Sequence, residues 1–258
     1  MSCSVAGHRY LDMGRPFSQR VDIPNLNQRS FVYVGAHVVA EDATGKGTVS
    51  PRALGALLEA AKRRGWSVNL CERNTRKLIL TFDDGRRFDD TLAGVLDDHG
   101  ATAIFFVCTA EGLGAYQDRP LGELSQENRQ YLLARHVVGG HTHAHTDLRA
   151  LARSQQRALL EDSAERFAHW FGFRPWLFAY PWGRYRVHTL RVLRTIGVRY
   201  GFIAAAGALY THDLLIPRVL IDQRGWTDGD YDFVMRARAS VPNNVKLLMR
   251  RAHIGLVR

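Results

Sequence analysis

The sequence predicts an α/β protein built as a single domain around a parallel sheet or barrel. Apolar segments of strand length alternate with longer segments of helical spacing, as in parallel strands joined by helices. The chain has 258 residues, and α/β barrels of about 250 residues often form one domain. Hydrophobic residues make up 46% and charged residues 23% of the sequence. This composition argues against both extensive disorder and a membrane protein.

The first part of the chain predicts an irregular lead-in, one strand and one helix. Residues 1–30 are polar and contain glycine, proline and asparagine without clear periodicity. The segment 31–40 is apolar and rich in valine, which predicts a strand. Ser50 and Pro51 are typical of an N-cap and a first helical residue, and Gly65 ends the predicted helix after residue 64.

The remainder of the chain continues the alternation of strands and helices. Short apolar segments predict the strands, and longer segments with helical spacing predict the helices. The predicted elements are, in order, strand 77–82, helix 88–99, strand 103–107, helix 126–136, a strand ending at 138, helix 148–171, strand 176–180, helix 187–196 and strand 199–204.

Positive charge is concentrated at the C-terminal end. Lys and Arg outnumber Asp and Glu by 35 to 25, which gives a net charge of +10. This basic segment is either a solvated tail or a contact for a phosphate-bearing lipid or ligand. Nucleic-acid binding is the weaker explanation, because no recognised basic motif with interleaved aromatic residues is present. From residue 233 onward acidic residues are absent, and the Lys and Arg residues are Arg236, Arg238, Lys246, Arg250, Arg251 and Arg258.

Cysteines and apolar segments bear on where the protein is found. Cys3, Cys71 and Cys108 are odd in number and lack the spacing of metal or redox motifs, which favours a reducing compartment. Residues 1–20 lack the apolar run of about 7 to 15 residues that a signal peptide needs. No segment approaches the roughly 18 apolar residues of a membrane span. We therefore expect a soluble cytoplasmic protein.

Two adjacent carboxylates follow the predicted strand 77–82. Functional groups in a parallel α/β fold collect at the carboxyl ends of strands, and Asp83 and Asp84 stand at such an end. Adjacent carboxylates repel each other, so keeping both costs stability unless a cation or hydrogen-bond donors compensate. Taken alone, the sequence Asp-Asp-Gly is more often a turn or a helix cap.

Three histidines lie within five residues after another predicted strand. His141 and His145 are four residues apart, so they can face the same side of a helical turn and ligate one metal ion. Isolated histidines are usually surface or satisfied core residues, so this spacing alone is a weak signal. Together with Asp84 the pair completes a set of two imidazoles and one carboxylate, which leaves positions for water and substrate.

The segment F-A-Y-P-W-G at 178–183 closes a third predicted strand. Its aromatic turn, made rigid by proline, can form a wall of a sugar site and direct backbone N–H groups at a developing oxyanion. A packed loop explains the segment equally well when it is taken alone.

Together these three segments resemble the polysaccharide deacetylase family, also described as the NodB-homology domain or carbohydrate esterase family 4. The resemblance rests on T-F-D-D-G at 81–85, H-T-x-x-H at 141–145 and the turn at 178–183. The apolar segment 101–107 is also similar to the strand that follows the first motif of the family. The resemblance extends from about residue 77 to residue 221, and the ordered combination of motifs is specific although each motif alone is not.

The resemblance implies a deformed (β/α) barrel that hydrolyses an N-acetyl or related acyl group on an amino sugar. Carried over by position, it makes Asp83 the general base. It assigns Asp84, His141 and His145 to a divalent metal ion, commonly Zn²⁺. Such an ion would polarise the acyl carbonyl and acidify its bound water, while the base takes a proton during attack.

Other residues receive supporting roles from the same resemblance. The backbone N–H of Trp182 would help to hold the oxyanion, and Thr142 would support the metal loop. His143 occupies a variable position of the motif and is a lesser candidate. Classical members have an arginine where this chain has Ala179, and this chain resembles the branch with F-A-Y-P-Y-G instead. Arg218, at another apparent strand start, is the hypothetical substitute that orients the catalytic Asp.

The late L-x-H motif of the family, whose histidine is the general acid in classical members, has no clear copy in this chain. His212 lies in the corresponding part of the chain but in a loop-like context, and it is a weak candidate. Loss of the acid could slow the reaction by ~10²-fold or more, although a metal-bound water or a substrate group could deliver the proton.

The sequence therefore predicts a metal-dependent deacetylase acting on an oligosaccharide, a glycan precursor or a glycosylated metabolite. One alternative is deacetylation or deformylation of a polyprenyl-phosphate-linked sugar, with the basic C-terminal segment at an anionic membrane. Another is a non-catalytic carbohydrate-binding relative, against which the retention of both Asp83 and Asp84 argues. On this interpretation 1–75 is an N-terminal extension packing on the barrel, 76–225 is the deacetylase core and 226–258 is the basic C-terminal segment.

Overall fold

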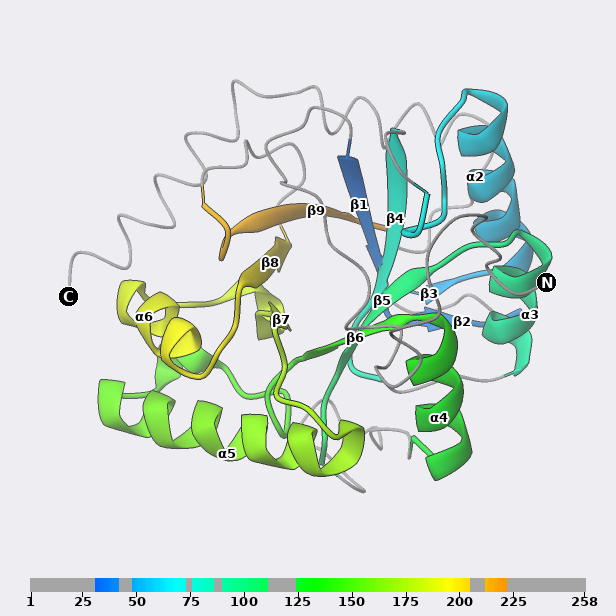
Figure 1. Ribbon diagram of the computed structural model, residues 1–258. Coiled ribbons are helices and arrows are strands. Elements are labelled where there is room, and N and C mark those ends of the chain that lie inside the picture. Colours follow the sequence, from blue (N-terminus) through cyan, green and yellow to red (C-terminus); the bar gives the residue numbers. More distant parts are fainter. Residues whose placement is uncertain are drawn as a thin grey trace, which may run out of the picture.

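Seven parallel strands close into a barrel in the computed structural model (Figure 1). The structure describes residues 31–41, 48–72, 76–85, 90–110, 124–204 and 212–221. The predicted fold, an α/β domain built around a parallel barrel, is confirmed. In their order around the barrel the strands are β1 (Phe31–Ala36), β4 (Lys77–Phe82), β5 (Ala103–Val107), β6 (Val137–Gly140), β7 (Leu177–Ala179), β8 (Tyr200–Ala204) and β9 (Ile216–Leu220).

Helices lie outside the barrel, with α2, α3 and α4 on one side and α5 and α6 on another (Figure 1). The helix predicted from residue 148 is divided in the structure, because a short 3₁₀ turn, η1 (Leu148–Ala150), precedes α5. A second such turn, η2 (Pro181–Gly183), follows β7. The helices are α2 (Pro51–Arg63), α3 (Asp90–Asp98), α4 (Gln126–Arg135), α5 (Arg153–Phe171) and α6 (Val187–Thr195).

Local sequence explains where several elements begin and end. The Ser50 side chain accepts a hydrogen bond of 3.2 Å from the backbone N–H of Ala53, so α2 begins with the predicted cap and proline. Helix α5 ends at Gly172, whose φ of 79° is the left-handed conformation that glycine adopts most easily. The predicted strand 31–40 is interrupted by a bend at residue 37. Its second part, β2 (Val38–Val39), pairs with β3 (Thr48–Val49) in a separate small sheet.

The barrel closes where β1 pairs with both β4 and β9. Opposite each other in β1 and β9 stand Gly35 and Leu220. A Cβ atom on Gly35 would lie 2.5 Å from the Leu220 side chain, so the absence of a side chain here permits the close approach of β9. Residues 1–75 were predicted to pack on the barrel as an extension. Strand β1 lies within that segment and is one of the strands of the barrel itself.

Apolar side chains fill the barrel interior and the layer between barrel and helices. The interior cluster includes Tyr33, Ile104, Phe106 and Phe202, all nearly inaccessible to solvent. The carboxyl end of the barrel differs from this core, because buried polar side chains gather there. This end therefore holds the candidate site.

Several predictions concern residues outside the described ranges. They are the irregular lead-in 1–30, which contains Cys3, and the basic C-terminal segment 226–258. No helix in the described part of the chain has both the length and the apolar character that a membrane crossing requires.

Candidate active site

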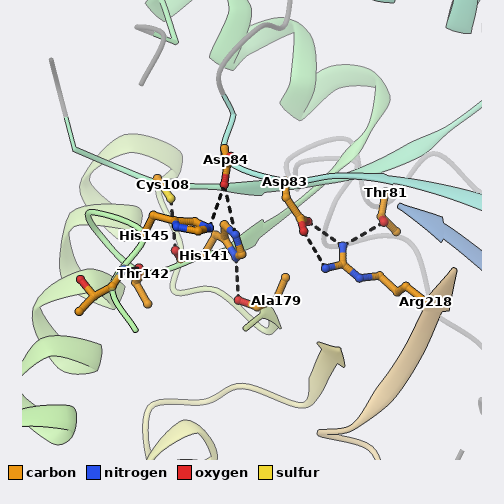
Figure 2. A network of polar contacts seen from close by, with 10 residues as sticks. Thr81, Asp83, Asp84, Cys108, His141, Thr142, His145, Ala179 and Arg218 are labelled. Atoms are coloured by element: carbon orange, nitrogen blue, oxygen red, sulfur yellow. Dashed lines mark hydrogen bonds and ion pairs between the residues drawn. The ribbon is translucent and has the colours of Figure 1, made fainter. Parts of the chain in front are cut away.

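The carboxyl ends of three barrel strands bring the predicted motifs together. Asp83 and Asp84 follow β4, His141 and His145 follow β6, and Trp182 lies in η2 after β7. Strand β5 lies between β4 and β6, and β6 pairs with β7, so the motifs converge across neighbouring strands. Figure 2 shows the two histidine rings directed at the Asp84 carboxylate.

One carboxylate oxygen faces two imidazole nitrogens in a buried cluster. The Nε2 atoms of His141 and His145 each lie 3.3 Å from Oδ1 of Asp84. The three candidate ligand atoms lie within 4.8 Å of one another, and all three residues are buried. The Nδ1 atom of His141 lies 2.8 Å from the carbonyl oxygen of Ala179. A proton on Nδ1 would be donated to that carbonyl, leaving the Nε2 lone pair directed at the cluster, as metal-bound histidines require.

The three titratable groups of the cluster respond differently to burial and to one another. Burial opposes ionisation of Asp84, but the hydrogen bond and the charge of His141 hold the pKa of that carboxyl well below its usual range. Burial and the neighbouring His141 lower the pKa of His145 to about 3, so its ring is neutral at neutral pH. Burial also opposes charge on His141, yet its hydrogen bond to Asp84 raises its pKa. A bound cation would replace the proton that Asp84 favours on His141, because a histidine must be neutral to ligate a metal ion.

Backbone strain is concentrated at this site. Among the described residues, positive φ angles occur at only four that are not glycine: Asp84 (73°), Thr142 (63°), His145 (51°) and Trp182 (53°). This conformation is uncommon for residues with a Cβ atom, and strained residues cluster at functional sites. The Thr142 hydroxyl accepts a hydrogen bond of 3.0 Å from the Thr146 backbone, so it braces the loop that carries both histidines.

Arg218 forms a buried ion pair with Asp83 by a two-point contact (Figure 2). Its Nη1 and Nη2 atoms donate to the two carboxylate oxygens at 2.6 and 2.7 Å. Nη1 also donates to the Thr81 hydroxyl at 3.0 Å. Burial opposes ionisation of Asp83, but the Arg218 charge outweighs this effect and lowers the pKa of the carboxyl. The arginine from β9 thus holds Asp83 in one orientation, at the place proposed for it from the sequence.

Trp182 combines a strained backbone with an exposed indole. Its side chain is 41% exposed, and its ring contacts the edge of His145 with 4.2 Å between the ring centroids. The side chain therefore lies at the entrance of the cluster, where a substrate would meet it.

Two histidines considered from the sequence lie outside the cluster. Nδ1 of His143 contacts the Thr109 hydroxyl at 3.0 Å, and His143 is absent from the set of mutually close ligand atoms. His212 precedes β9 and its Nδ1 accepts from the Leu214 backbone at 3.0 Å. The backbone N–H of Gly201, the second residue of β8, donates to the adjacent Asp213 carbonyl at 2.9 Å, so His212 lies near the amino end of the barrel. Its place at the opposite end removes His212 as the acid.

His37 is a site residue that the sequence reasoning missed. It stands in the bend directly after β1, at the same end of the barrel as Asp83 and Asp84. Its charge is close enough to contribute to lowering the pKa of both carboxyls and of His145. Its Nδ1 atom is buried and has no hydrogen-bond partner in the ranges that the structure covers. The available signal was a single polar residue inside the apolar segment 31–40, which was predicted to be one continuous strand.

Solved structures with the same architecture include several deacetylases. The Streptococcus pyogenes deacetylase PplD, in a complex with acetate, is 21% identical with a TM-score of 0.61, and the match covers 74% of this chain and 92% of PplD. A de-N-acetylase from Aggregatibacter actinomycetemcomitans is 15% identical with a TM-score of 0.64, and the match covers 79% of this chain and 99% of that one. These similarities identify the class of fold, the deformed barrel that these deacetylases share.

The family model for polysaccharide deacetylases matches residues 72–201. The chain belongs to the polysaccharide deacetylase family. The Bacillus subtilis protein YxkH is 28% identical over 133 residues, which make up 51% of this chain and 46% of YxkH. The chain thus matches less than half the length of the curated relatives.

Proposed function

We propose that this chain is a metal-dependent hydrolase that removes an N-acetyl or related acyl group from an amino sugar. The observation that carries the proposal is the buried cluster of Asp84, His141 and His145 beside a second carboxylate, Asp83, that Arg218 holds ionised. A metal site for binding alone needs no oriented base next to it. Membership of the polysaccharide deacetylase family supports the same reaction.

The donor set fits a divalent cation, with Zn²⁺ the ion we expect. Two imidazole nitrogens and one carboxylate oxygen are typical ligands of catalytic zinc and of related transition metals. Bound there, such an ion would supply Lewis-acid polarisation of the acyl oxygen and would make a water molecule more acidic. Asp84, His141 and His145 would hold it.

Asp83 would take the proton of the attacking water. Its lowered pKa keeps the carboxyl ionised at neutral pH, so it can accept a proton without first losing one. Arg218 contributes position as well as charge, because two parallel hydrogen bonds limit rotation of the carboxylate. The backbone N–H of Trp182 is the proposed donor to the oxyanion that develops during attack.

His37 is our candidate for returning a proton to the leaving amine. It lies on the Asp83 and Asp84 side of the barrel, and it follows β1, the strand that pairs with β4. An imidazole can donate and accept protons near neutral pH, which a leaving amine requires. The role assigned in classical members to a late histidine would then fall to a residue that precedes the Asp83 motif.

Three sources of an acylated amino sugar fit the proposed reaction. They are an oligosaccharide or glycan precursor, a glycosylated metabolite, and a sugar linked to polyprenyl phosphate. A non-catalytic carbohydrate-binding protein is the alternative from another class, and the oriented Asp83 argues against it. A cytoplasmic location is part of the proposal.

The test is acetate or formate release from a panel of N-acylated sugars by the Zn²⁺-loaded chain. We expect Asp83→Asn to abolish release while metal content stays unchanged, and His141→Ala to lose both. His37→Gln should retain the metal and lower turnover by ~10²-fold, which is typical of a lost general acid. His143→Gln is the matched control, because His143 lies outside the cluster. Release by Asp83→Asn at the rate of the unchanged chain would refute the proposed mechanism.

A further inference from the structure

Four arginines form a basic border beside the candidate site, here called the arginine rim: Arg149, Arg153, Arg184 and Arg186. Arg149 and Arg153 follow the metal-ligand loop, in η1 and at the start of α5, and Arg184 and Arg186 lie between η2 and α6. The two connections leave neighbouring strands, β6 and β7, at the carboxyl end of the barrel.

Contacts connect the arginine rim to the candidate site, and within the rim they connect Arg186 to Arg149. The Arg184 guanidinium lies 5.7 Å from the centre of the Trp182 ring, which itself contacts His145. The Arg186 side chain donates to the Arg149 carbonyl at 2.9 Å. A further buried hydrogen bond of 2.6 Å, from the Thr189 hydroxyl to Gln156, links the first turns of α6 and α5. The rim is therefore continuous with the Trp182 side of the site.

Most of the positive charge in the rim lacks a local counter-charge. Arg184 pairs with Asp147 at 2.6 Å. In the ranges of the chain that the structure covers, Arg149, Arg153 and Arg186 form no ion pair with a carboxylate. Burial and then the charges of Arg186 and Arg153 lower the pKa of nearby His188, as expected in a positive field.

The positions of Arg153 and Arg186 oppose the usual preference of helix ends. Helix N-termini carry partial positive charge and favour acidic residues in the first turn. Neither α5 nor α6 has an acidic residue there; α5 begins at Arg153, and Arg186 is the N-cap of α6. The arginines therefore add positive charge to two helix ends that already carry partial positive charge. Such an arrangement weakens the folded state unless an anion is bound, and local conflicts of this kind occur at functional sites.

We propose that the arginine rim binds an anionic group, a carboxylate or a phosphate, on the part of the substrate next to the reacting amino sugar. The exposed indole of Trp182 lies between the metal cluster and the rim, where it can pack against the intervening sugar face. The inference rests on the proposed function and narrows its substrate class to acylated amino sugars that carry negative charge.

The test compares binding of three disaccharides of N-acetylglucosamine to the Zn²⁺-loaded full chain by calorimetry. The second sugar is glucose, glucuronic acid or glucose 6-phosphate. We expect about tenfold tighter binding of one or both charged disaccharides, and loss of this preference in Arg149→Gln/Arg153→Gln, since two exposed charge contacts are removed. The matched control is Arg174→Gln/Arg199→Gln, which removes two exposed arginines away from the rim. High salt should reduce the preference in the unchanged chain.

Each outcome separates the subsite from the reaction. Preference for the uronate or for the phosphate identifies which anion the rim takes. Equal affinity for all three disaccharides, no binding of any, or equal losses in rim and control variants would overturn the subsite. Acetate release is followed in the same samples. A charge preference without release leaves the subsite and removes the hydrolase, whereas release at equal kcat/KM from charged and neutral disaccharides leaves the hydrolase and removes the subsite.

Discussion

Asp83 and Arg218 form a buried ion pair in the candidate site. Both groups are almost completely removed from solvent, Arg218 at 1% and Asp83 at 5% exposure. Taking two charges out of water is costly, and the cost is offset only by good geometry and additional hydrogen bonds. The two-point contact and the Thr81 hydroxyl supply these, and the guanidinium also lies 5.1 Å from the centre of the Phe106 ring. The pair is better explained by orientation of Asp83 than by stability.

Arg218 variants separate position from charge. Arg218→Lys keeps the charge but loses the two-point contact, so we expect turnover to fall by about 10²-fold through misplacement of Asp83. Metal content should not change, because Arg218 does not contact the cluster. Arg218→Ala leaves a buried carboxylate without its partner and should lower the free energy of unfolding by about 3–5 kcal/mol. Turnover, metal content and urea unfolding are the measurements, and an Ala variant with full turnover and intact metal binding would disprove the positioning role.

At the scale of single residues, the sequence predicted chemistry better than geometry. The carboxylate and the two histidines of the cluster were predicted because their types and spacing match metal ligands. Proximity of Arg218 to Asp83 was also predicted, and the structure brings them into contact. His37 was missed because it is a single histidine without distinctive spacing and falls inside the predicted strand 31–40. The positive φ angles of Asp84 and His145 could not be predicted, because only the folded loops impose them.

At the scale of elements, the junction between α4 and β6 contains a buried titratable group. His136 is the C-cap residue of α4 and is 1% exposed, beside the ring of Phe105. Burial lowers the pKa of His136 from 6.5 to about 4, with the nearby Asp97 opposing and Arg135 reinforcing the shift. The folded state therefore binds this proton more weakly than the unfolded chain does.

This difference predicts acid sensitivity from one residue. A depressed pKa in the folded state gives stability that is complete above the unfolded pKa of about 6.5 and is lost as pH falls toward 4. The loss should reach about 3 kcal/mol for a shift of this size. In His136→Gln the free energy of unfolding should vary less with pH between about pH 7 and about pH 4. Exposed His169 provides the control, because His169→Gln should retain the full pH dependence; an unchanged slope in His136→Gln would exclude His136 as the source.

Boundaries of elements were predictable where a local signal marks them. Ser50, Pro51 and Gly65 set the ends of α2 close to the observed ones. The bend at residue 37 and the 3₁₀ turn before α5 were not predicted, because apolar and helical patterns continue through both. In each case the interruption lies at the carboxyl end of the barrel, and tertiary contacts rather than local preference determine the backbone there.

At the scale of the whole molecule, alternating strands and helices predicted the barrel but not its closure. Pairing of β1 with β9 joins Val34 to Val219, residues distant in sequence. The spacing of apolar residues along the sequence does not indicate such a long-range contact. The segment that contains β1 was therefore assigned to the extension 1–75 rather than to the barrel. Closure also has a functional consequence, because β9 carries Arg218 across to Asp83 at the end of β4.

Metal binding should stabilise the entire barrel, because the ligands join two separate connections. Asp84 follows β4, whereas His141 and His145 follow β6, so an ion would link them across β5. A ligand that binds only the folded state at about 100 times its Kd adds ~2.7 kcal/mol to stability. For a chain of this size that corresponds to a rise in Tm of roughly 5–10 °C.

Thermal unfolding with Zn²⁺ and with a chelator measures this coupling. We expect His145→Gln to abolish the rise in Tm, because one of the three clustered ligands is lost. His143→Gln, two residues away and in contact with Thr109 instead, should retain it. A rise that persists in His145→Gln would mean that the stabilising ion binds elsewhere. Since Asp83 is not a ligand in this scheme, Asp83→Asn should unfold at a metal-dependent Tm like that of the unchanged chain even where its turnover is lost.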